Sequence, residues 1–348
     1  MNFDKIFLQS GNNLTVVHPK GHVVNFKMPD YFNIKDVSDD LKAITLILLF
    51  SRIDKNLINY KFTRKSAGDK IGLAFSGGVD STAAYCLLPK DKRVLFHHKR
   101  IITSPTLYKH DNPMHVIECL PDKVLIINSD LEDIRLKYKD VAGFFTPFAF
   151  FSGFVLLVDY LKIGYLACGF MLEQAYIEYG YKYRDFHNCI FYEKWFQLFK
   201  QANLPLFFPV IPCSEVLTNK IVNTNKIFAQ PCVRGKDGKS CNTCYKCFRK
   251  KLLNGSLVEN YGSFSEIKRI ITHRPLKQGA SLIYAMNKGN FNIPELVEYK
   301  NLDLSWLENY FEYTLLSMPE EYRDYMKNEL NKYTMSITDN KILENFKL

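Results

Sequence analysis

Five short apolar runs, separated by helix-like stretches, occupy the middle of the chain. Each run has the length and composition of a strand buried on both faces. Strands and helices that alternate in this way predict an α/β fold with an open parallel sheet, helices on both faces and right-handed crossovers. The predicted strands are 71–75, 93–97, 123–128, 164–168 and 206–210, and the predicted helices are 81–89, 113–120, 147–162 and 190–202.

The pattern changes on both sides of this region. Residues 1–66 alternate apolar and polar positions in short runs and then enter a helix-like stretch, which predicts a small antiparallel sheet and one helix. Residues 256–348 show helical spacing throughout and are predicted to be entirely helical. We therefore predict an N-terminal β-rich extension (1–66), a five-stranded α/β domain (67–255) and a helical C-terminal region (256–348).

One long uncharged segment has to be tested as a membrane span. Eighteen residues without charge lie between Asp140 and Asp159, but Gly143, Pro147 and Gly153 interrupt them. A helix buried against a sheet has the same composition, and the segment falls between two predicted strands. We therefore predict no membrane contact.

Charge and cysteine content suggest the compartment and the partners. The N-terminus has no apolar stretch of the length that export requires, so we predict a cytoplasmic protein. Nine cysteines in a reducing compartment indicate metal ligands rather than disulfides where they cluster. The net charge of +10 is spread along the chain, which leaves contact with nucleic acid open and would also suit an acidic partner.

The first predicted strand runs directly into Ser-Gly-Gly-Val-Asp-Ser-Thr, residues 76–82, which we call the Ser-Gly-Gly loop. Gly77 and Gly78 permit a tight turn and a close approach of the backbone to a ligand. Hydroxyl groups and the N-terminus of the next helix favour phosphate oxygens. The sequence lacks the Gly-Lys-Ser/Thr ending of Walker loops and the G-x-G-x-x-G spacing of dinucleotide sites. We predict a phosphate or pyrophosphate site.

A second motif places Cys232, Cys241, Cys244 and Cys247 in the spacing C-x8-C-x2-C-x2-C. Four thiolates suit tetrahedral Zn²⁺ and leave no open position for water, which favours a structural role. An iron–sulfur cluster is the alternative. The charge of such a centre would be offset by neighbouring cations, for which the candidates are Lys236, Lys239, Lys246 and Arg249.

The Ser-Gly-Gly loop, as FSGGVDST after a strand, resembles the signature of the PP-loop (HUP-type) ATP pyrophosphatases. This resemblance implies cleavage of ATP to AMP and pyrophosphate, with Mg²⁺, through an adenylated oxygen that a nitrogen or sulfur nucleophile then displaces. It implies that Asp80 and Ser81 act in catalysis and that His97, at the end of the second strand, lies near the adenine. The implied ATP-binding residues are Ser76, Gly77, Gly78, Val79, Asp80, Ser81, Thr82 and His97.

Loop and cysteine spacing together resemble the 7-cyano-7-deazaguanine synthases (QueC-like enzymes) over residues 67–255. The resemblance implies a zinc knot and a 7-deazaguanine-type substrate, with candidate contacts at Glu173, Tyr181 and Arg184. The chain departs from the family in two segments: FFTPFAFFSG stands where the family has a Pro-Gly-Arg-Asn stretch, and GFMLEQAYIEYGYKYRDF after the fourth strand lacks the family's Pro-Asp-Cys. The extensions at both ends are a further departure.

Four functions remain open at this point. Relatives with such extensions occur in anti-phage operons, which implies adenylation of 7-carboxy-7-deazaguanine and transfer to an amine of a protein acceptor encoded nearby. A synthase that uses ammonia is the first alternative, and a PP-loop enzyme that modifies tRNA is the second. The third is a non-catalytic scaffold that binds nucleotide.

Overall fold

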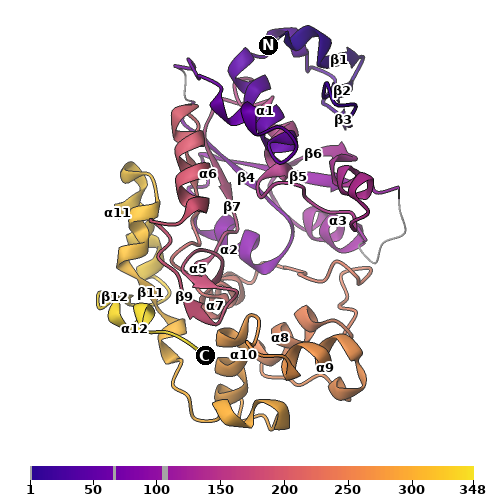
Figure 1. Ribbon diagram of the computed structural model, residues 1–348. Coiled ribbons are helices and arrows are strands. Elements are labelled where there is room, and N and C mark those ends of the chain that lie inside the picture. The colour runs from indigo at the N-terminus through magenta and orange to yellow at the C-terminus, as the bar shows by residue number, and fades with distance from the viewer. Residues whose placement is uncertain (1, 66–67, 104–108) are drawn as a thin grey trace.

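The computed structural model describes residues 2–65, 68–103 and 109–348 (Figure 1). All five predicted strands are present and pair in parallel. They lie in the order β6-β5-β4-β7-β10, so the chain moves outward from β4 to β6 and then returns to the other side of β4. The strands are β4 (Lys70–Ala74), β5 (Arg93–Arg100), β6 (Val124–Ser129), β7 (Ile163–Cys168) and β10 (Leu206–Phe207).

The sheet has eight strands rather than the five predicted, because the N-terminal strands join it. Strands β1 (Phe7–Ser10), β2 (Asn13–Val17) and β3 (Val23–Lys27) are antiparallel, and β3 pairs with β6 through Phe26 and Ser129. The prediction of a separate small sheet is therefore wrong. The joining strand covers the edge of β6, whose backbone groups would otherwise lack partners.

Helices connect the parallel strands in doubly wound fashion. Helix α1 packs against α4, and α2 packs against α7. The helices of this part are α1 (Asp39–Phe50), α2 (Val79–Leu87), α3 (Asp111–Glu118), α4 (Ser152–Val155), α5 (Leu172–Ala175), α6 (Ile190–Gln201), α7 (Glu215–Asn225) and α8 (Tyr245–Leu253), and a small hairpin consists of β8 (Ile177–Glu178) and β9 (Lys182–Tyr183).

The predicted helix 147–162 is much shorter than expected. The segment forms a 3₁₀ turn at Ala149–Phe151, then α4, and then irregular turns up to β7. A Cβ on Gly153 would lie 2.9 Å from a methyl carbon of Ile127, so this backbone packs directly against β6. The segment is buried in the core, and among the described residues no helix has the length and apolar character needed to cross a membrane.

The C-terminal region is mostly helical, but not entirely. It contains α9 (Ser265–Thr272), α10 (Gly279–Lys288), α11 (Glu320–Asn331) and α12 (Lys341–Glu344) together with several 3₁₀ turns. A two-stranded parallel sheet of β11 (Tyr310–Phe311) and β12 (Ser336–Ile337) contradicts the all-helical prediction. Tyr322 of α11 stacks on Phe207 of β10 with ring centroids 4.8 Å apart, so this region shares the main core.

Candidate functional site

The Ser-Gly-Gly loop leaves β4 at its carboxyl end and enters α2. Gly77 has φ +74°, a conformation that glycine adopts without strain. The hydroxyl groups of Ser81 and Thr82 each donate to the Gly78 carbonyl at 3.0 Å, and Ser76 and Ser81 hydroxyls are 3.0 Å apart. Gly78 caps α2 without a side-chain bond, so the first N–H groups of this helix keep their capacity for an anion.

Gly169 directly follows β7, the neighbour of β4 in the sheet. Because it has no side chain, the carboxyl end of β7 approaches the Ser-Gly-Gly loop closely. A Cβ at Gly169 would lie 2.6 Å from the Ser81 nitrogen and 2.7 Å from the Asp80 carbonyl carbon. Real side chains do not tolerate such distances to backbone atoms, so only glycine fits at this position without a shift of α2. The carboxyl ends of β4 and β7 are thereby held together where the strand order reverses, the usual place for a ligand in an open α/β sheet.

A cavity of about 510 Å³ opens at this edge of the sheet, and we call it the main cavity. Its volume lies within the usual range of small-molecule sites. Among the eight residues predicted to bind ATP, five line it, whereas Gly77, Val79 and Thr82 lie behind the loop surface. The five are Ser76, Gly78, Asp80, Ser81 and His97.

Seven phenylalanines line the main cavity among the residues that the structure describes. Phe75 follows β4 and Phe96 lies in β5, and we call the other five the phenylalanine wall. Phe170 and Phe191 stack with centroids 5.8 Å apart at an interplanar angle of 2°. Three rings of the wall belong to the segment FFTPFAFFSG, which therefore faces the cavity with aromatic side chains. Such a wall suits a flat ring. The wall consists of Phe144, Phe148, Phe150, Phe170 and Phe191.

Glu173 does not line the main cavity among the described residues, although it was predicted to contact substrate. It is buried, and its Oε1 accepts a hydrogen bond of 2.8 Å from the Glu215 backbone N–H at the start of α7. Burial raises the pKa of Glu173 to about 8. Its position assigns Glu173 to the attachment of α7.

Tyr181 and Arg184 also lie outside the cavity lining. The Tyr181 carbonyl accepts from the Leu348 backbone N–H at 2.7 Å, so this residue contacts the C-terminal residue described. Arg184 donates to the carbonyls of Gln174 and Ala175, where α5 ends. A cation suits a helix C-terminus, and Gln174 itself lines the cavity. Arg184 thus positions a cavity residue and does not face the cavity itself.

The four predicted metal ligands come together. The sulfur atoms of Cys232, Cys241, Cys244 and Cys247 all lie within 4.8 Å of one another, and the Cys241 and Cys247 sulfurs are 3.8 Å apart. Backbone N–H groups donate to two of them, from Cys241 to Cys232 and from Cys247 to Cys244. We call this group the four-cysteine cluster, and its geometry suits a metal ion bound by four thiolates.

The four-cysteine cluster is joined to the Ser-Gly-Gly loop by residues that the sequence analysis did not single out. The Gln230 backbone N–H donates to the Gly77 carbonyl at 2.8 Å, and the Gln230 side chain accepts from the Cys232 N–H at 3.1 Å. Asn112 of α3, fully buried, donates to the Cys232 carbonyl at 2.6 Å. No local pattern announces the contact of Gln230 with Gly77 or that of Asn112 with Cys232, because these partners are distant in sequence.

Helix α8 begins at the four-cysteine cluster and carries basic residues toward the loop. Lys246 lines the main cavity, and Lys250 lies 3.9 Å from the Asp80 carboxylate. Lys250 and Arg249 also pair with buried Glu215 at 2.9 and 2.8 Å. Burial alone would raise the pKa of Glu215, but these two cations hold it well below its usual value.

These contacts correct the predicted charge compensation of the metal centre. Arg249 is directed to Glu215 and Lys246 to the cavity, so neither serves mainly to offset the cysteines. The cation whose pKa responds to Cys241 and Cys244 is Arg234, which is also paired with Glu266. Lys246 lies between two ligands in the sequence, yet its side chain lines the main cavity, so sequence position alone did not identify the cation beside the cluster.

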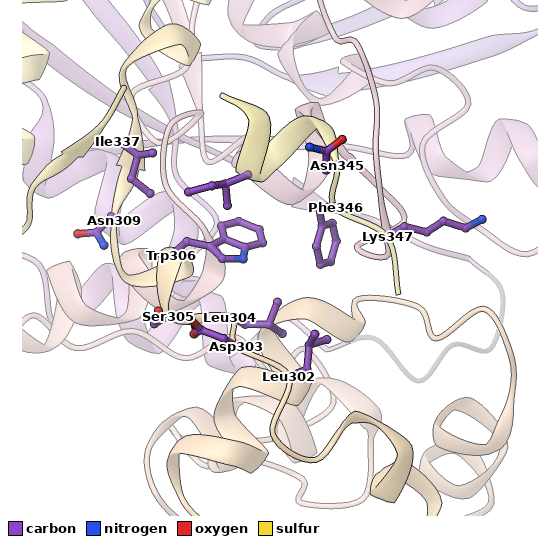
Figure 2. A pocket seen from close by; sticks show the side chains of 11 residues that line it. Leu302, Asp303, Leu304, Ser305, Trp306, Asn309, Ile337, Asn345, Phe346 and Lys347 are labelled. Carbon is purple, nitrogen blue, oxygen red and sulfur yellow. Dashed lines mark hydrogen bonds between the residues drawn. The ribbon is translucent and has the colours of Figure 1, made fainter. Parts of the chain in front are cut away.

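A second cavity, of about 550 Å³, lies in the C-terminal region. Figure 2 shows its lining, which includes Trp306 and Phe346 with ring centroids 5.3 Å apart. The polar groups here serve local structure: Asp303 accepts from the Ser305 N–H, and Asn309 accepts from the Thr334 hydroxyl. The Ser-Gly-Gly loop and the N-terminus of α2 border the main cavity and are not part of the lining of this second one.

Comparison with known proteins adds little to this geometry. Residues 194–347 match the model of a "Family of unknown function (DUF6395)", which leaves the Ser-Gly-Gly loop outside the match. No curated protein matches the chain. Among solved structures, the U34-tRNA thiolase NcsA from Methanococcus maripaludis, with its 4Fe-4S cluster, aligns at 12% identity over 77% of this chain and 83% of that chain. Its TM-score of 0.32 is too low to establish a shared fold, so the site is interpreted from its own geometry.

The chain is thus a mixed α/β protein with a largely parallel eight-stranded sheet, a helix N-terminus open to a cavity at the strand-order switch, and a cluster of four cysteines.

Proposed function

We propose that this protein is an ATP-dependent enzyme of the PP-loop type that adenylates a carboxylate on a flat ring and transfers the acyl group to a nitrogen nucleophile. The observation that carries the proposal is the main cavity itself. An anion site, made by the Ser-Gly-Gly loop and the start of α2, and the phenylalanine wall line the same space of about 510 Å³. ATP supplies the phosphates, and an aromatic acid suits the wall.

In the proposed reaction, a carboxylate oxygen of the acid attacks the α-phosphorus of ATP. The bond to the bridging oxygen breaks and pyrophosphate leaves. The nitrogen nucleophile then attacks the acyl carbon, AMP leaves and the nitrogen loses a proton. The resemblance to 7-cyano-7-deazaguanine synthases makes 7-carboxy-7-deazaguanine the first acid to test, and an amine of a protein the first acceptor.

The residues of the loop have defined tasks in this scheme. Backbone N–H groups of α2 and the hydroxyls of Ser76 and Ser81 bind phosphate oxygens, and Lys246 offsets charge that grows on the leaving pyrophosphate. Asp80 lines the cavity and offers hard oxygen ligands, which fit Mg²⁺. When bound there, Mg²⁺ would neutralise phosphate charge.

We assign zinc to the four-cysteine cluster. Four sulfurs bound to one Zn²⁺ at about 2.3 Å are about 3.8 Å apart, which is the separation of the Cys241 and Cys247 sulfurs, 3.8 Å. In an iron–sulfur cubane each cysteine binds a different iron, which requires wider spacing. The assignment is tested by metal analysis of protein purified without added metal, where zinc supports it and iron with inorganic sulfide overturns it.

The decisive experiment uses ATP labelled at the α-phosphate, Mg²⁺ and 7-carboxy-7-deazaguanine. Labelled AMP that forms only when the acid is present supports the proposal. The variant Asp80→Asn is expected to lose at least about 100-fold in this rate, the scale typical of removing one electrostatic contact to a transition state. Asp91→Asn, at an exposed site outside the cavity, is the matched control.

The other outcomes separate the alternatives. ADP as the product, or AMP formation that does not depend on the acid, overturns the deazaguanine assignment. Nucleotide binding without any turnover identifies a scaffold. If AMP forms with the acid, mass spectrometry of the products shows whether ammonia or a protein amine is the acceptor.

A further inference from the structure

A buried group of charged side chains lies directly behind the Ser-Gly-Gly loop, and we call it the Glu215 cluster. It consists of Glu215 at the start of α7, Arg249 and Lys250 on α8, and Asp80 of the loop. Glu215 Oε1 accepts from an Arg249 N–H at 2.8 Å and lies 2.9 Å from Lys250 Nζ. The same Nζ is 3.9 Å from Asp80 Oδ1. Glu215, Arg249 and Lys250 are each at most 6% exposed, so water cannot replace a partner that is lost.

Glu215 is fixed in place by more than its two cations. Its Oε2 accepts from the Ser281 hydroxyl of α10 at 2.8 Å. Helix α7, which begins at Glu215, packs against α2, and the Thr218 hydroxyl of α7 donates to Asp80 Oδ1 at 3.1 Å. One helix therefore holds both carboxylates between which the ammonium group of Lys250 lies.

The formal charges of the Glu215 cluster cancel, but the two carboxylates do not share the cations equally. Burial alone would raise the pKa of Glu215, but Arg249 and Lys250 hold it well below its usual value, so this carboxylate is ionised. Coulomb attraction falls with distance, so Lys250 is offset mainly by Glu215, at 2.9 Å, and less by Asp80, at 3.9 Å. Asp80 thus keeps most of its negative charge for a ligand in the main cavity, which it lines.

We propose that Glu215 is a positioning residue for the phosphate end of the main cavity: it binds Lys250 and so keeps this cation from pairing with Asp80, whose carboxylate is left for Mg²⁺. Without the charge of Glu215, the buried ammonium group would turn to Asp80, because an unpaired buried charge is costly. A cation held against Asp80 repels Mg²⁺. This inference rests on the proposed function only in that a nucleoside triphosphate binds with Mg²⁺ at Asp80, and it does not depend on the acid or the acceptor.

The test is calorimetric binding of α,β-methylene-ATP, which cannot be cleaved between the α- and β-phosphates, with Mg²⁺ and in buffer without divalent cations. The ratio of the two dissociation constants measures how much Mg²⁺ tightens binding. Glu215→Gln is expected to lower this ratio roughly tenfold, the scale of coupling within one ion-pair network. Lys250→Met removes the competing cation and should raise the ratio above the wild-type value. The double variant restores the charge balance and should return the ratio to within about threefold of wild type.

Opposite effects of the two single variants, with recovery in the double variant, identify a role of charge. A purely structural role of Glu215 would weaken binding with and without Mg²⁺ alike, and a second buried substitution would add to the loss. Glu259→Gln, which removes one carboxylate at an exposed site, is the matched control and should leave the ratio unchanged.

The possible failures are distinguishable. An unchanged ratio in Glu215→Gln, no recovery in the double variant, or a wild-type ratio of one overturns the role of Glu215. The proposed function stands in each of these cases if acid-dependent AMP still forms. If the analogue does not bind to a wild-type protein with a cooperative thermal transition, both proposals fail. Thermal melts show whether each variant folds, and if Glu215→Gln does not, a ratio in Lys250→Met at or below that of wild type overturns the inference.

Discussion

The two ends of the main cavity are built in different ways. At the phosphate end, one segment of seven residues, 76–82, supplies the turn, the hydroxyls and the helix start. At the aromatic end, five phenylalanines come from three segments: 144–150, Phe170, and Phe191 at the start of α6. The difference teaches that the part which would bind phosphates in the proposed reaction is encoded locally. The part that would bind the proposed acid depends on long-range packing.

A third element, the four-cysteine cluster, supports only the phosphate end. Gln230 connects it to Gly77, and α8 carries Lys246 and Lys250 from the cluster to the cavity. None of the four ligands lines the main cavity among the described residues. Changes to the cluster should therefore affect nucleotide binding before they affect the acid.

The largest expected effect follows from loss of the metal. Cys244→Ser, or removal of the metal by a chelator, should abolish measurable nucleotide binding and lower the thermal midpoint, because binding energy at structural zinc sites is on the order of 10 kcal/mol. Calorimetric binding, thermal melts and metal analysis measure this. Cys119→Ser, at an exposed cysteine, is the control. Wild-type nucleotide affinity in metal-free Cys244→Ser would show that the cluster and the loop are independent.

A methyl group at the contact between β7 and α2 should be the next most damaging change. In Gly169→Ala the new Cβ meets the Ser81 nitrogen at 2.6 Å, so α2 has to move. We expect roughly 10- to 100-fold weaker nucleotide binding and about 1–3 kcal/mol less stability. Gly262→Ala is the control, because a Cβ there meets nothing within 4 Å. Unchanged nucleotide affinity in Gly169→Ala would mean that the position of α2 does not matter for the phosphates.

A change at the aromatic end should separate the two substrates. Phe191→Ala removes one ring of the phenylalanine wall and is expected to raise the KM for the acid roughly fivefold, given about 1 kcal/mol for an aromatic pair. The dissociation constant of ATP should change less than about twofold. Steady-state kinetics and calorimetry measure the two effects. Ile190→Ala, on the same helix but 81% exposed, is the control. An equal loss of affinity for the acid and for ATP would show that the two ends of the cavity act as one site.

The last prediction concerns the pH dependence of stability, not ligand binding, and it rests on Glu173. Its folded-state pKa of about 8 exceeds its ordinary value of 4.5, so between these pH values the folded protein holds a proton that the unfolded chain releases. The stabilising contribution is therefore complete below about pH 4.5 and is lost as pH rises through 8, at up to about 1.4 kcal/mol per pH unit. Denaturant unfolding of wild type and Glu173→Gln across this range should show curves that diverge with pH.

The control for that experiment is Glu259→Gln, at an exposed glutamate. Its unfolding free energy should follow the wild-type pH profile. Parallel profiles for wild type and Glu173→Gln would show that Glu173 is ionised throughout and that its buried carboxylate has another partner.

The sequence predicted the elements whose signals are local. The five parallel strands, α2 and the grouping of the four cysteines are present as expected. The helix predicted at 147–162 was wrong in extent, since apolar composition alone does not distinguish a buried helix from buried turns. The N-terminal strands were predicted correctly, but they join the parallel sheet and do not form a sheet of their own. Hydrophobic alternation identifies a strand but not the strand that pairs with it.

The predictions for the acid-binding residues illustrate the same limit within the site. Glu173, Tyr181 and Arg184 were chosen by resemblance, and among the described residues they are not part of the cavity lining. They contact α7, the C-terminal residues and the end of α5 instead. Among the residues that do line the cavity are Phe170 and Lys246. Phenylalanine is a common residue in a protein core, and lysine is a common residue on a surface helix. Only their position relative to the loop distinguishes them.

The sequence by itself therefore determined the turn after β4, the start of α2 and the ligand set of the four-cysteine cluster. Glycine conformation, helix capping and short ligand spacing act over a few residues, so the sequence carries them directly. The tertiary structure alone decided the edge pairing of β3 with β6, the phenylalanine wall, the link from Gln230 to Gly77 and the placement of His97 at the cavity. These depend on contacts between distant segments, and burial there is decided by packing rather than by local pattern.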